Sequence, residues 1–416
     1  MPTTRPARVS RVPVTPALPT LPRARLARLA LAAQGLHREY TFGRGIRGVQ
    51  RAIEHLGYVQ IDTISVVARA HHHTLFTRVP DYQPDMLDRL QARRQIFEYW
   101  YHAAAYLPMC DYRFALPRML AIRTGARHWF TARDRKLEAQ VLERIRNEGA
   151  LRTRDLDNDE TSPGAASGWW NWKPAKRAIE ALFMEGTLMC AGRDGFAKVY
   201  DLPERVLPPD IDVTPPDDAE YAAYLVRTHL RANGFAAEKE FSYLRRGAPI
   251  RAAIRAHLDE GVANATMQRM RVAETQAEVY VLTETLQHRP KVAPQVRLLS
   301  PFDNAIIQRD RTVRVHDFDY QIECYVKATK RQFGYFCLPI LYGERLIGRA
   351  DCKAERKMGV LRVVHLHIER SDVDATEFAA QLLPALKAFA TFNGCQELSI
   401  DQVSPRSYRA VLKQLR

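Results

Sequence analysis

The feature that most constrains the fold is a local pattern of helices that end at glycine and lead into two short strands. Residues 134–148 have amphipathic helical spacing and end at a glycine, and residues 174–185 begin with proline, which is favoured at the first helical position. Residues 187–200 then place two strand-like runs on either side of a Gly-Arg-Asp-Gly turn. Helices closed by such a hairpin are the plan of a winged helix-turn-helix.

The same pattern occurs on both sides of this unit. Its predicted elements are helices at 46–55 and 83–92 with strands within 97–107, and helices at 219–231 and 249–260 with strands within 267–283. Proline-rich linkers at 207–218 and 288–295 separate the units. Thr20 is the predicted N-cap of a leucine-rich helix that precedes the first unit.

From residue 296 onward the pattern changes to strands. Residues 333–341, 345–353 and 360–369 alternate around glycine-containing turns, and a helix at 376–392 and a strand at 397–401 follow. In the middle strand Arg349 and Lys353 share one face, which is mostly charged. This region predicts a small, strongly curved antiparallel sheet or barrel.

The expected fold class is therefore α+β, with three tandem winged helix-turn-helix domains followed by a C-terminal antiparallel β-barrel-like domain. The expected bounds are a disordered basic arm at 1–19, winged helices at 20–125, 126–210 and 211–290, and the β-barrel-like domain at 291–416.

The charge of the chain favours a polyanionic partner. The formal net charge is +15, and the sequence pI is about 9.6. Residues 1–60 hold ten arginines against two acidic residues, which is a local net charge of +8. The alternative is a basic surface that is simply solvated.

Cysteine and hydropathy patterns favour a cytoplasmic protein. The six cysteines are scattered without metal-ligand spacing, which is typical of reduced thiols. We expect no membrane span, because no apolar run reaches the length that a bilayer requires. His71, His72 and His73 are adjacent, so they cannot all face one metal ion. We expect no metal and no cofactor.

The segment Val59-Gln60-Ile61-Asp62-Thr63-Ile64 alternates apolar and polar residues with the period of an extended chain. On such a segment Gln60 and Asp62 point the same way, about 7 Å apart. A carboxylate and an amide on one face can hold and polarise a water molecule. The alternative is the polar edge of a surface strand.

Several longer stretches make the chain resemble a known family. They are Leu29-Ala30-Leu31-Ala32-Ala33-Gln34-Gly35-Leu36, Val59-Gln60-Ile61-Asp62-Thr63-Ile64, Ser167-Gly168-Trp169-Trp170-Asn171-Trp172-Lys173-Pro174, Leu299-Ser300-Pro301-Phe302-Asp303, Asp317-Phe318-Asp319-Tyr320, Tyr335–Pro339, Gly348-Arg349-Ala350-Asp351 and Lys357–Leu361. Over residues 20–400 the sequence resembles the YcaQ/AlkZ-type DNA glycosylases, which unhook interstrand crosslinks. Gln60-Ile61-Asp62 is similar to the Gln–apolar–Asp signature of one branch.

The resemblance implies a monofunctional DNA glycosylase for cationic N7-alkylguanine lesions, including crosslinks, with Gln60 and Asp62 as its catalytic residues. The residues expected to bind DNA are Arg44, Arg47, Arg51, Arg349, Lys353, Trp169 and Trp170. The two tryptophans are alternatively an apolar cluster, and Arg349 and Lys353 a solvated face. His102 is a possible accessory residue or a packed, hydrogen-bonded histidine.

The expected partner is double-stranded DNA with alkylated guanine or crosslinks, bound by a nucleoid-associated monomer. A Schiff-base lyase is not expected, because the first lysine of the chain is Lys136. The rival hypothesis is a non-catalytic winged-helix DNA-binding regulator, which would explain the charge but not the Gln60–Asp62 pair.

Overall fold

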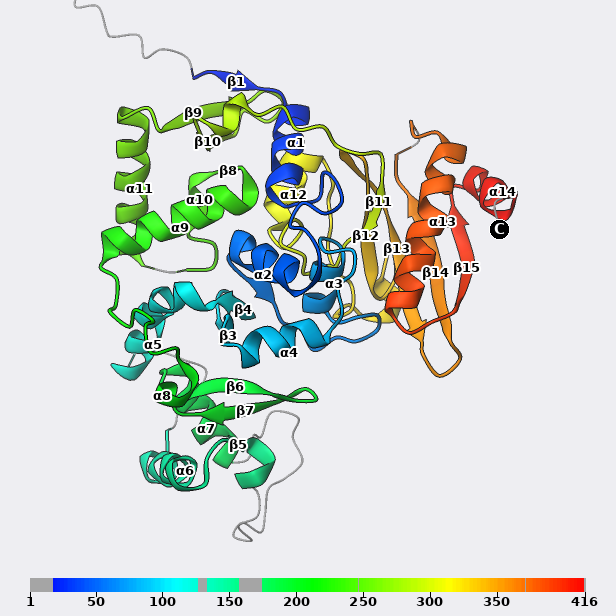
Figure 1. Ribbon diagram of the computed structural model, residues 1–416. Coiled ribbons are helices and arrows are strands. Elements are labelled where there is room, and N and C mark those ends of the chain that lie inside the picture. Colours follow the sequence, from blue (N-terminus) through cyan, green and yellow to red (C-terminus); the bar gives the residue numbers. More distant parts are fainter. Residues whose placement is uncertain (1–17, 126–132, 157–173, 246, 371, 415–416) are drawn as a thin grey trace, which may run out of the picture.

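A computed structural model describes residues 18–125, 133–156, 174–245, 247–370 and 372–414 (Figure 1). The described residues form fourteen α-helices and three β-sheets, so the predicted α+β class is confirmed. Trp169 and Trp170, together with residues 1–17 of the predicted basic arm, lie outside the described residues. None of the described helices is long and apolar enough to cross a bilayer.

One order of elements occurs three times along the chain: helix, short strand, one or two further helices, and a hairpin. The first set is α2 (Gly45–Leu56), β2 (Val59–Gln60), α3 (Ala70–Phe76), α4 (Asp85–Ala92), β3 (Ile96–Trp100) and β4 (Ala104–Pro108). The second is α6 (Arg135–Glu148), β5 (Leu151–Arg152), η2 (Thr153–Leu156), α7 (Pro174–Met184), β6 (Met189–Asp194) and β7 (Ala197–Asp201). The third is α9 (Asp218–Asn233), β8 (Phe235–Ala236), α10 (Glu238–Phe241), α11 (Ala248–Ala263), β9 (Met267–Val272) and β10 (Glu278–Leu282).

In every set the short strand pairs antiparallel with the second strand of the hairpin: β2 with β4, β5 with β7, and β8 with β10. The short strand thereby ties the end of the first helix to the hairpin. The remaining short elements between and beside the sets are η1 (Met109–Ala115), α5 (Leu116–Arg123), α8 (Pro203–Val206) and η3 (Thr285–Gln287).

The first two sets share a six-stranded sheet in the order β2-β4-β3-β6-β7-β5. Their junction is the pairing of Glu98 on β3 with Cys190 on β6. Glu98 is buried there, and its carboxylate pairs with Arg193 at 2.9 Å and Lys198 at 3.6 Å. Since a lone carboxylate would be costly in this position, the two cations from the second set are part of what joins it to the first.

The third set forms a four-stranded sheet in the order β1-β9-β10-β8. Its edge strand β1 (Thr20–Leu21) comes from the start of the described chain and runs parallel to β9. Thr20 is therefore in a strand, and the prediction that it caps a helix is wrong. The helix α1 (Arg23–Ala33) begins after Pro22, whose extended backbone is restricted by its ring and leads into the first turn.

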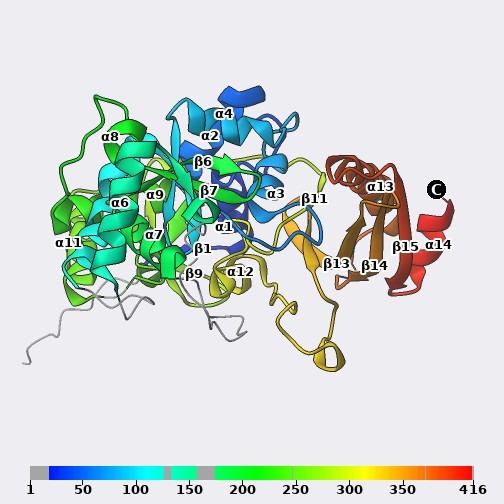
Figure 2. The ribbon, with the colours of Figure 1, turned by 90° about the horizontal axis from the view of Figure 1, so that it is seen from below.

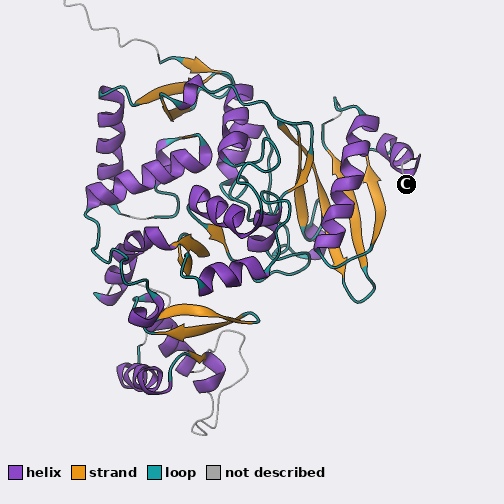
Figure 3. Cartoon of the chain, viewed as in Figure 1, coloured by secondary structure: helices purple, strands orange, loops and turns teal. Residues whose placement is uncertain are grey.

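The C-terminal part is a five-stranded sheet in the order β11-β12-β13-β14-β15, with α13 (Ala375–Phe392) across one face (Figure 3). The strands are β11 (Val296–Leu298), β12 (Cys337–Tyr342), β13 (Arg345–Glu355), β14 (Val360–Ile368) and β15 (Glu397–Ser404), and α14 (Ser407–Gln414) follows. The three strands predicted to be antiparallel, β12, β13 and β14, are antiparallel, but the domain as a whole is not, because β15 runs parallel to β14. The chain crosses over through α13 between them, and such a crossover produces a parallel pair.

Two further observations distinguish this sheet from the predicted barrel. Its strand order has two ends among the described residues, β11 and β15, so the described strands do not close on themselves. Between β11 and β12 a long segment carries α12 (Arg309–His316) and η4 (Ala328–Lys330), and part of it extends away from the body of the protein (Figure 2).

Candidate active site

Gln60 lies in the strand that follows α2, because Gly57 ends the helix and turns the chain. Gly57 has a positive φ of 78°, and a Cβ in its place would lie 2.3 Å from the methyl group of Thr228 on α9. The chain then enters β2, where Gln60 pairs with Ala105 of β4. The Gln60 side chain is buried in this position.

His102, at the tip of the β3–β4 hairpin, contacts the amide of Gln60. Its Nε2 lies 3.0 Å from Oε1 of Gln60. Burial, with a smaller contribution from the nearby charge of Arg245, lowers the pKa of His102 to about 4. The imidazole is therefore neutral at neutral pH, and its Nε2–H donates to the Gln60 oxygen. This contact directs the amide NH₂ of Gln60 away from His102, where it can donate to another group.

Three tyrosines surround His102. Its ring packs edge-on against Tyr58, Tyr101 and Tyr243, with ring centroids 5.2, 5.8 and 5.3 Å away. Arg245 lies over the Tyr101 ring at 4.2 Å. Among the described residues, Nδ1 of His102 is buried without a hydrogen-bond partner. The histidine is thus packed and hydrogen-bonded, as one alternative expected, and it also contacts a predicted site residue.

Asp62 follows β2 in irregular backbone and is half-buried. Its Oδ1 accepts a hydrogen bond from the backbone N–H of Ile64 at 2.7 Å. Burial raises the pKa of Asp62, and hydrogen bonds from the backbone of Ile64 and Thr63 partly oppose that shift. No described cation contributes to the shift, so the carboxylate carries its charge without an ion-pair partner. A positive charge that develops beside it would be strongly stabilised.

A second segment lies beside Asp62. The negative charge of Asp62 raises the pKa of both Cys324 and Tyr325, after burial as the main cause. Tyr325 is 77% exposed and therefore accessible from solution. These residues lie in the segment between α12 and β12, for which no sequence motif predicted a role. The only signal in the sequence is their place soon after the Asp317–Tyr320 stretch.

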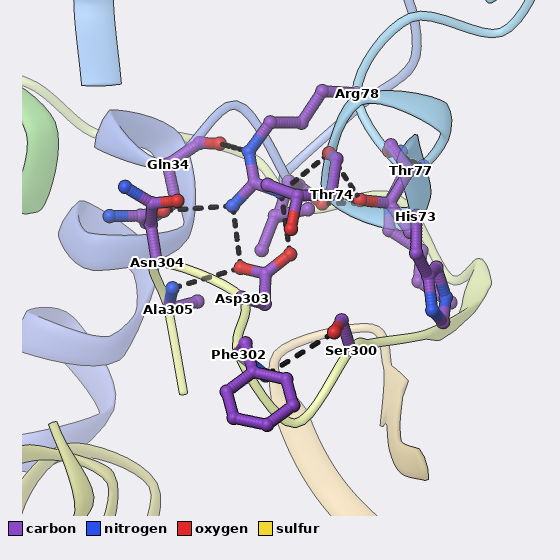
Figure 4. Close-up of polar contacts among 12 residues, drawn as sticks. Gln34, His73, Thr74, Thr77, Arg78, Ser300, Phe302, Asp303, Asn304 and Ala305 are labelled. Atoms are coloured by element: carbon purple, nitrogen blue, oxygen red, sulfur yellow. Dashed lines mark hydrogen bonds and ion pairs between the residues drawn. The ribbon is translucent and has the colours of Figure 1, made fainter. Parts of the chain in front are cut away.

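A buried ion pair holds the start of the segment that carries Gln60 and Asp62 (Figure 4). Arg78 and Asp303 have fully buried side chains and form two hydrogen bonds, of 2.7 and 2.8 Å. Gln34 accepts two more bonds from Arg78, through its side chain and its backbone carbonyl. The next residue, Asn304, donates from Nδ2 to the carbonyl of Tyr58 at 3.0 Å. The network therefore links α1, the end of α3 and the segment after β11 to the residue two positions before Gln60.

The C-terminal sheet holds the chain that follows Asp62. Arg356 donates to the carbonyl of Ser65 at 3.1 Å, and the backbone N–H of Ala354 donates to Val66. Asn393, at the end of α13, accepts from the backbone N–H of Ala68 at 2.6 Å. The short stretch that contains Gln60 and Asp62 is thus fixed on both sides by residues that are far away in the sequence.

The predicted DNA-binding arginines lie on and beside α2. Arg44, Arg47 and Arg51 are all exposed, and Arg51 donates to the carbonyl of Phe42 at 2.8 Å. Arg44 and Arg47 lie at the helix end that points away from Gln60, a helix length of roughly 20 Å. They are not part of the immediate surroundings of Gln60.

Arg349 and Lys353 do not share an exposed face. Arg349 is 3% exposed, pairs with Glu369 at 2.7 Å and lies over the Phe333 ring at 3.8 Å. A phosphate contact would require Arg349 to leave Glu369. The face is covered because the segment between α12 and β12 packs over β13. Lys353 has a 59% exposed side chain, which pairs with Glu355.

The three adjacent histidines are structural. His72 lies 2.6 Å from the hydroxyl of Tyr82 through Nδ1, and His73 lies 2.8 Å from the carbonyl of Leu298 through Nε2. Burial lowers the pKa of His72 and His73 to about 4, and it lowers that of His71 strongly. The part of the chain that the structure describes has no cluster of three or more His, Cys, Asp or Glu side chains suited to a metal ion.

Two comparisons place this arrangement among known proteins. The structure is similar to the DNA glycosylase AlkZ of Streptomyces sahachiroi, with a TM-score of 0.61 and 15% sequence identity. The likeness covers 92% of this chain and 100% of that one, and at this identity it shows a shared fold. The family described as DNA glycosylase AlkZ-like matches residues 53–392, which include Gln60, Asp62, Arg78 and Asp303. The chain therefore belongs to the AlkZ-like family of DNA glycosylases.

Proposed function

We propose that the chain is a monofunctional DNA glycosylase that hydrolyses the N-glycosidic bond of cationic N7-alkylguanine and thereby unhooks interstrand crosslinks. The observation that carries this proposal is the Asp62 carboxylate, half-buried and without a cation, two residues from an amide that a histidine orients. An unneutralised carboxylate beside an oriented amide suits a reaction in which positive charge develops on the substrate.

Alkylation at N7 leaves the guanine positively charged, so the base is already a good leaving group. The C1′–N9 bond breaks, its electron pair neutralises the base, and oxocarbenium character develops on the deoxyribose. Asp62 stabilises that cation and accepts a proton from the attacking water, whose oxygen forms the new bond to C1′. No acid is needed at the base, which is why a site with one carboxylate suffices for this lesion.

Gln60 positions the water or a sugar oxygen in this proposal. Its carbonyl oxygen is occupied by His102 Nε2, so its NH₂ group is the part that faces substrate. An amide cannot accept the proton, and this leaves Asp62 as the base. His102 acts through Gln60 and is a positioning residue.

We further propose that the three repeated sets are winged helix-turn-helix units that bind duplex DNA as a monomer. Arg44, Arg47, Arg51 and Lys353 are exposed cations suited to phosphate contacts. Trp169 and Trp170 remain candidates for stacking on DNA. The protein would act at the nucleoid in the cytoplasm.

The decisive experiment uses a duplex that carries one N7-guanine interstrand crosslink and an end label. Denaturing electrophoresis should show unhooked strands with an abasic site that breaks only after alkali. Asp62→Asn should lose this activity, whereas Asp85→Asn, which changes an exposed carboxylate on α4, should retain it. A wild-type protein that binds the duplex and leaves every crosslink intact would favour the non-catalytic regulator instead.

A further inference from the structure

A cavity of about 800 Å³ lies between α1, the end of α2, α9 and the linker that follows β10. Its lining includes five cations, Arg38, Arg227, Arg231, Arg289 and Lys291. Glu284 is the one acidic residue of the lining. All five cations are exposed, so they are accessible to a ligand from solution. We refer to this site as the cationic cavity.

The positive charge of the cationic cavity is not neutralised within the described chain. None of its five cations forms an ion pair with a described carboxylate. Arg231 donates to the carbonyl of His55, and Arg289 donates to the carbonyls of Leu286 and His288, which are neutral acceptors. Asp111 lies near enough to feel the charges of Arg227 and Arg231 but is not paired with them. Such a concentration of unpaired cations attracts an anion.

Two histidines of the lining lie in the positive electrostatic field of nearby arginines. Burial lowers the pKa of His37, and the charges of Arg38 and Arg297 lower it further. Burial also lowers the pKa of His55, with a further contribution from Arg231. Both side chains lie where an added positive charge is disfavoured. An anion in the cavity would reverse that effect.

The cationic cavity is separate from the surroundings of Gln60. On α9, Arg227, Leu230 and Arg231 line the cavity. Thr228, His229 and Asn233 lie beside Tyr58, Tyr101 and Tyr243, the tyrosines that surround His102. At 100° per residue these two groups occupy opposite faces of the helix. A ligand in the cationic cavity therefore lies behind α9 as seen from His102.

We infer that the cationic cavity binds a DNA strand, with successive phosphates on its arginines and Lys291 and a sugar or base against its aliphatic floor. The floor includes Leu29, Leu230 and Leu282. The cations come from three separate segments, and five exceed what a single phosphate or diphosphate needs, so a run of phosphates fits best. The inference rests on the proposed function, which supplies DNA as the partner. It adds a second DNA contact away from the catalytic segment.

The test measures the anisotropy of a labelled ten-nucleotide oligothymidylate with the full chain. Arg227→Gln combined with Lys291→Gln should weaken binding by about tenfold and reduce the slope of log affinity against log salt by about 1.4, or 0.7 for each lost phosphate contact. Lys387→Gln, an exposed lysine on α13, is the matched control and should leave affinity and slope unchanged. In the wild type, the oligonucleotide should raise the NMR-measured pKa of His37 and His55.

Two further measurements distinguish a DNA strand from a free nucleotide in the cavity and test the glycosylase activity separately. Single-turnover cleavage of a short lesion duplex at saturating protein should be equal in wild type and the double variant, so failure of the proposed glycosylase activity would be seen independently of this site. Equal oligothymidylate affinity in the double variant and the wild type would overturn the inference. So would displacement of the oligonucleotide by micromolar ADP, which would identify a free nucleotide as the occupant.

Discussion

Asp303 and Asp62 are two carboxylates near the segment that carries Gln60, and their surroundings differ: one has a cationic partner and the other has none. Asp303 is fully buried and meets a guanidinium whose donors are all used by Asp303, Gln34 and Thr74. Asp62 is half-buried and receives only backbone hydrogen bonds. The first charge is satisfied by the protein and holds the segment in place. In the proposed mechanism the Asp62 charge acts on the substrate, because a carboxylate that is already paired stabilises a developing cation poorly.

The largest expected effect comes from breaking the satisfied pair. Asp303→Asn should lower the free energy of unfolding by about 3–5 kcal/mol, because it leaves the Arg78 guanidinium buried without its counter-ion. Chemical denaturation of the variant measures this directly. Asp303→Leu combined with Arg78→Met should recover much of the loss, since it removes both buried charges. A loss of unfolding free energy below about 1 kcal/mol in Asp303→Asn would contradict the conclusion that the Asp303–Arg78 pair stabilises the fold.

Asp62, the carboxylate without a cationic partner, should matter for the cleavage rate and not for stability. Asp62→Asn should slow single-turnover cleavage of an N7-methylguanine duplex by on the order of 10²-fold or more, about 2.7 kcal/mol of barrier. The same change should leave the unfolding free energy equal or slightly higher, because it removes a half-buried charge without a partner. DNA affinity is the control. A variant that unfolds more easily would mean that Asp62 has a structural role.

Asn304 connects the two regions and should have an intermediate effect. Asn304→Leu removes its hydrogen bond to the Tyr58 carbonyl, so Gln60 should lose part of its alignment. We expect roughly tenfold slower single-turnover cleavage with unchanged DNA affinity, since orientation contributes to the barrier rather than to binding. Asn304→Asp, which retains an acceptor but no donor, should not rescue the rate. Equal loss of rate and affinity would indicate general destabilisation instead.

Gln60 should be less sensitive than Asp62. Gln60→Ala should reduce the cleavage rate by roughly tenfold or less, because water can partly replace an amide that binds but transfers no proton. Gln60→Glu is the informative companion, since it adds a negative charge at nearly constant shape. It should raise the pKa of Asp62 and move the pH profile of cleavage upward. An unchanged pH profile in Gln60→Glu would indicate that residue 60 is too far from the Asp62 carboxylate to affect its pKa.

The pH dependence is the smallest expected effect, and it follows from the raised pKa of Asp62 and the lowered pKa of His102. Cleavage should fall as pH drops through the raised pKa of Asp62, and His102 should add no step near neutral pH because its pKa is about 4. The stability contributions have opposite signs. The lowered pKa of His102 means that its contribution is lost as pH falls from about 6.5 to 4. The raised pKa of Asp62 means that its ionisation costs stability as pH rises, a cost absent in Asp62→Asn.

Local residues were enough to predict several parts of this protein. Helix spacing, glycine ends and turn residues predicted the longer helices and the hairpins of the three repeated sets, because these features depend on neighbours within a few positions. The short helices α3 and α10 were not predicted. Gln60 and Asp62 became catalytic candidates through the resemblance of Gln60-Ile61-Asp62 to a family signature, since their spacing alone fits the polar edge of a surface strand equally. The prediction failed at β15, where the direction of a strand depends on the crossover of a whole helix.

Sequence alone therefore determined the elements, the charge and the catalytic candidates, and tertiary structure decided which polar groups are satisfied. Arg78 and Asp303 are 225 positions apart, and Arg356 is 291 positions from Ser65. No spacing rule connects such residues. The alternation of residues in its strand predicted that Arg349 lies on a charged, exposed face. In the fold Arg349 pairs with Glu369 and lies over the Phe333 ring. Whether a charge is buried and paired depends on which distant segments pack around it, and that is set by the complete fold.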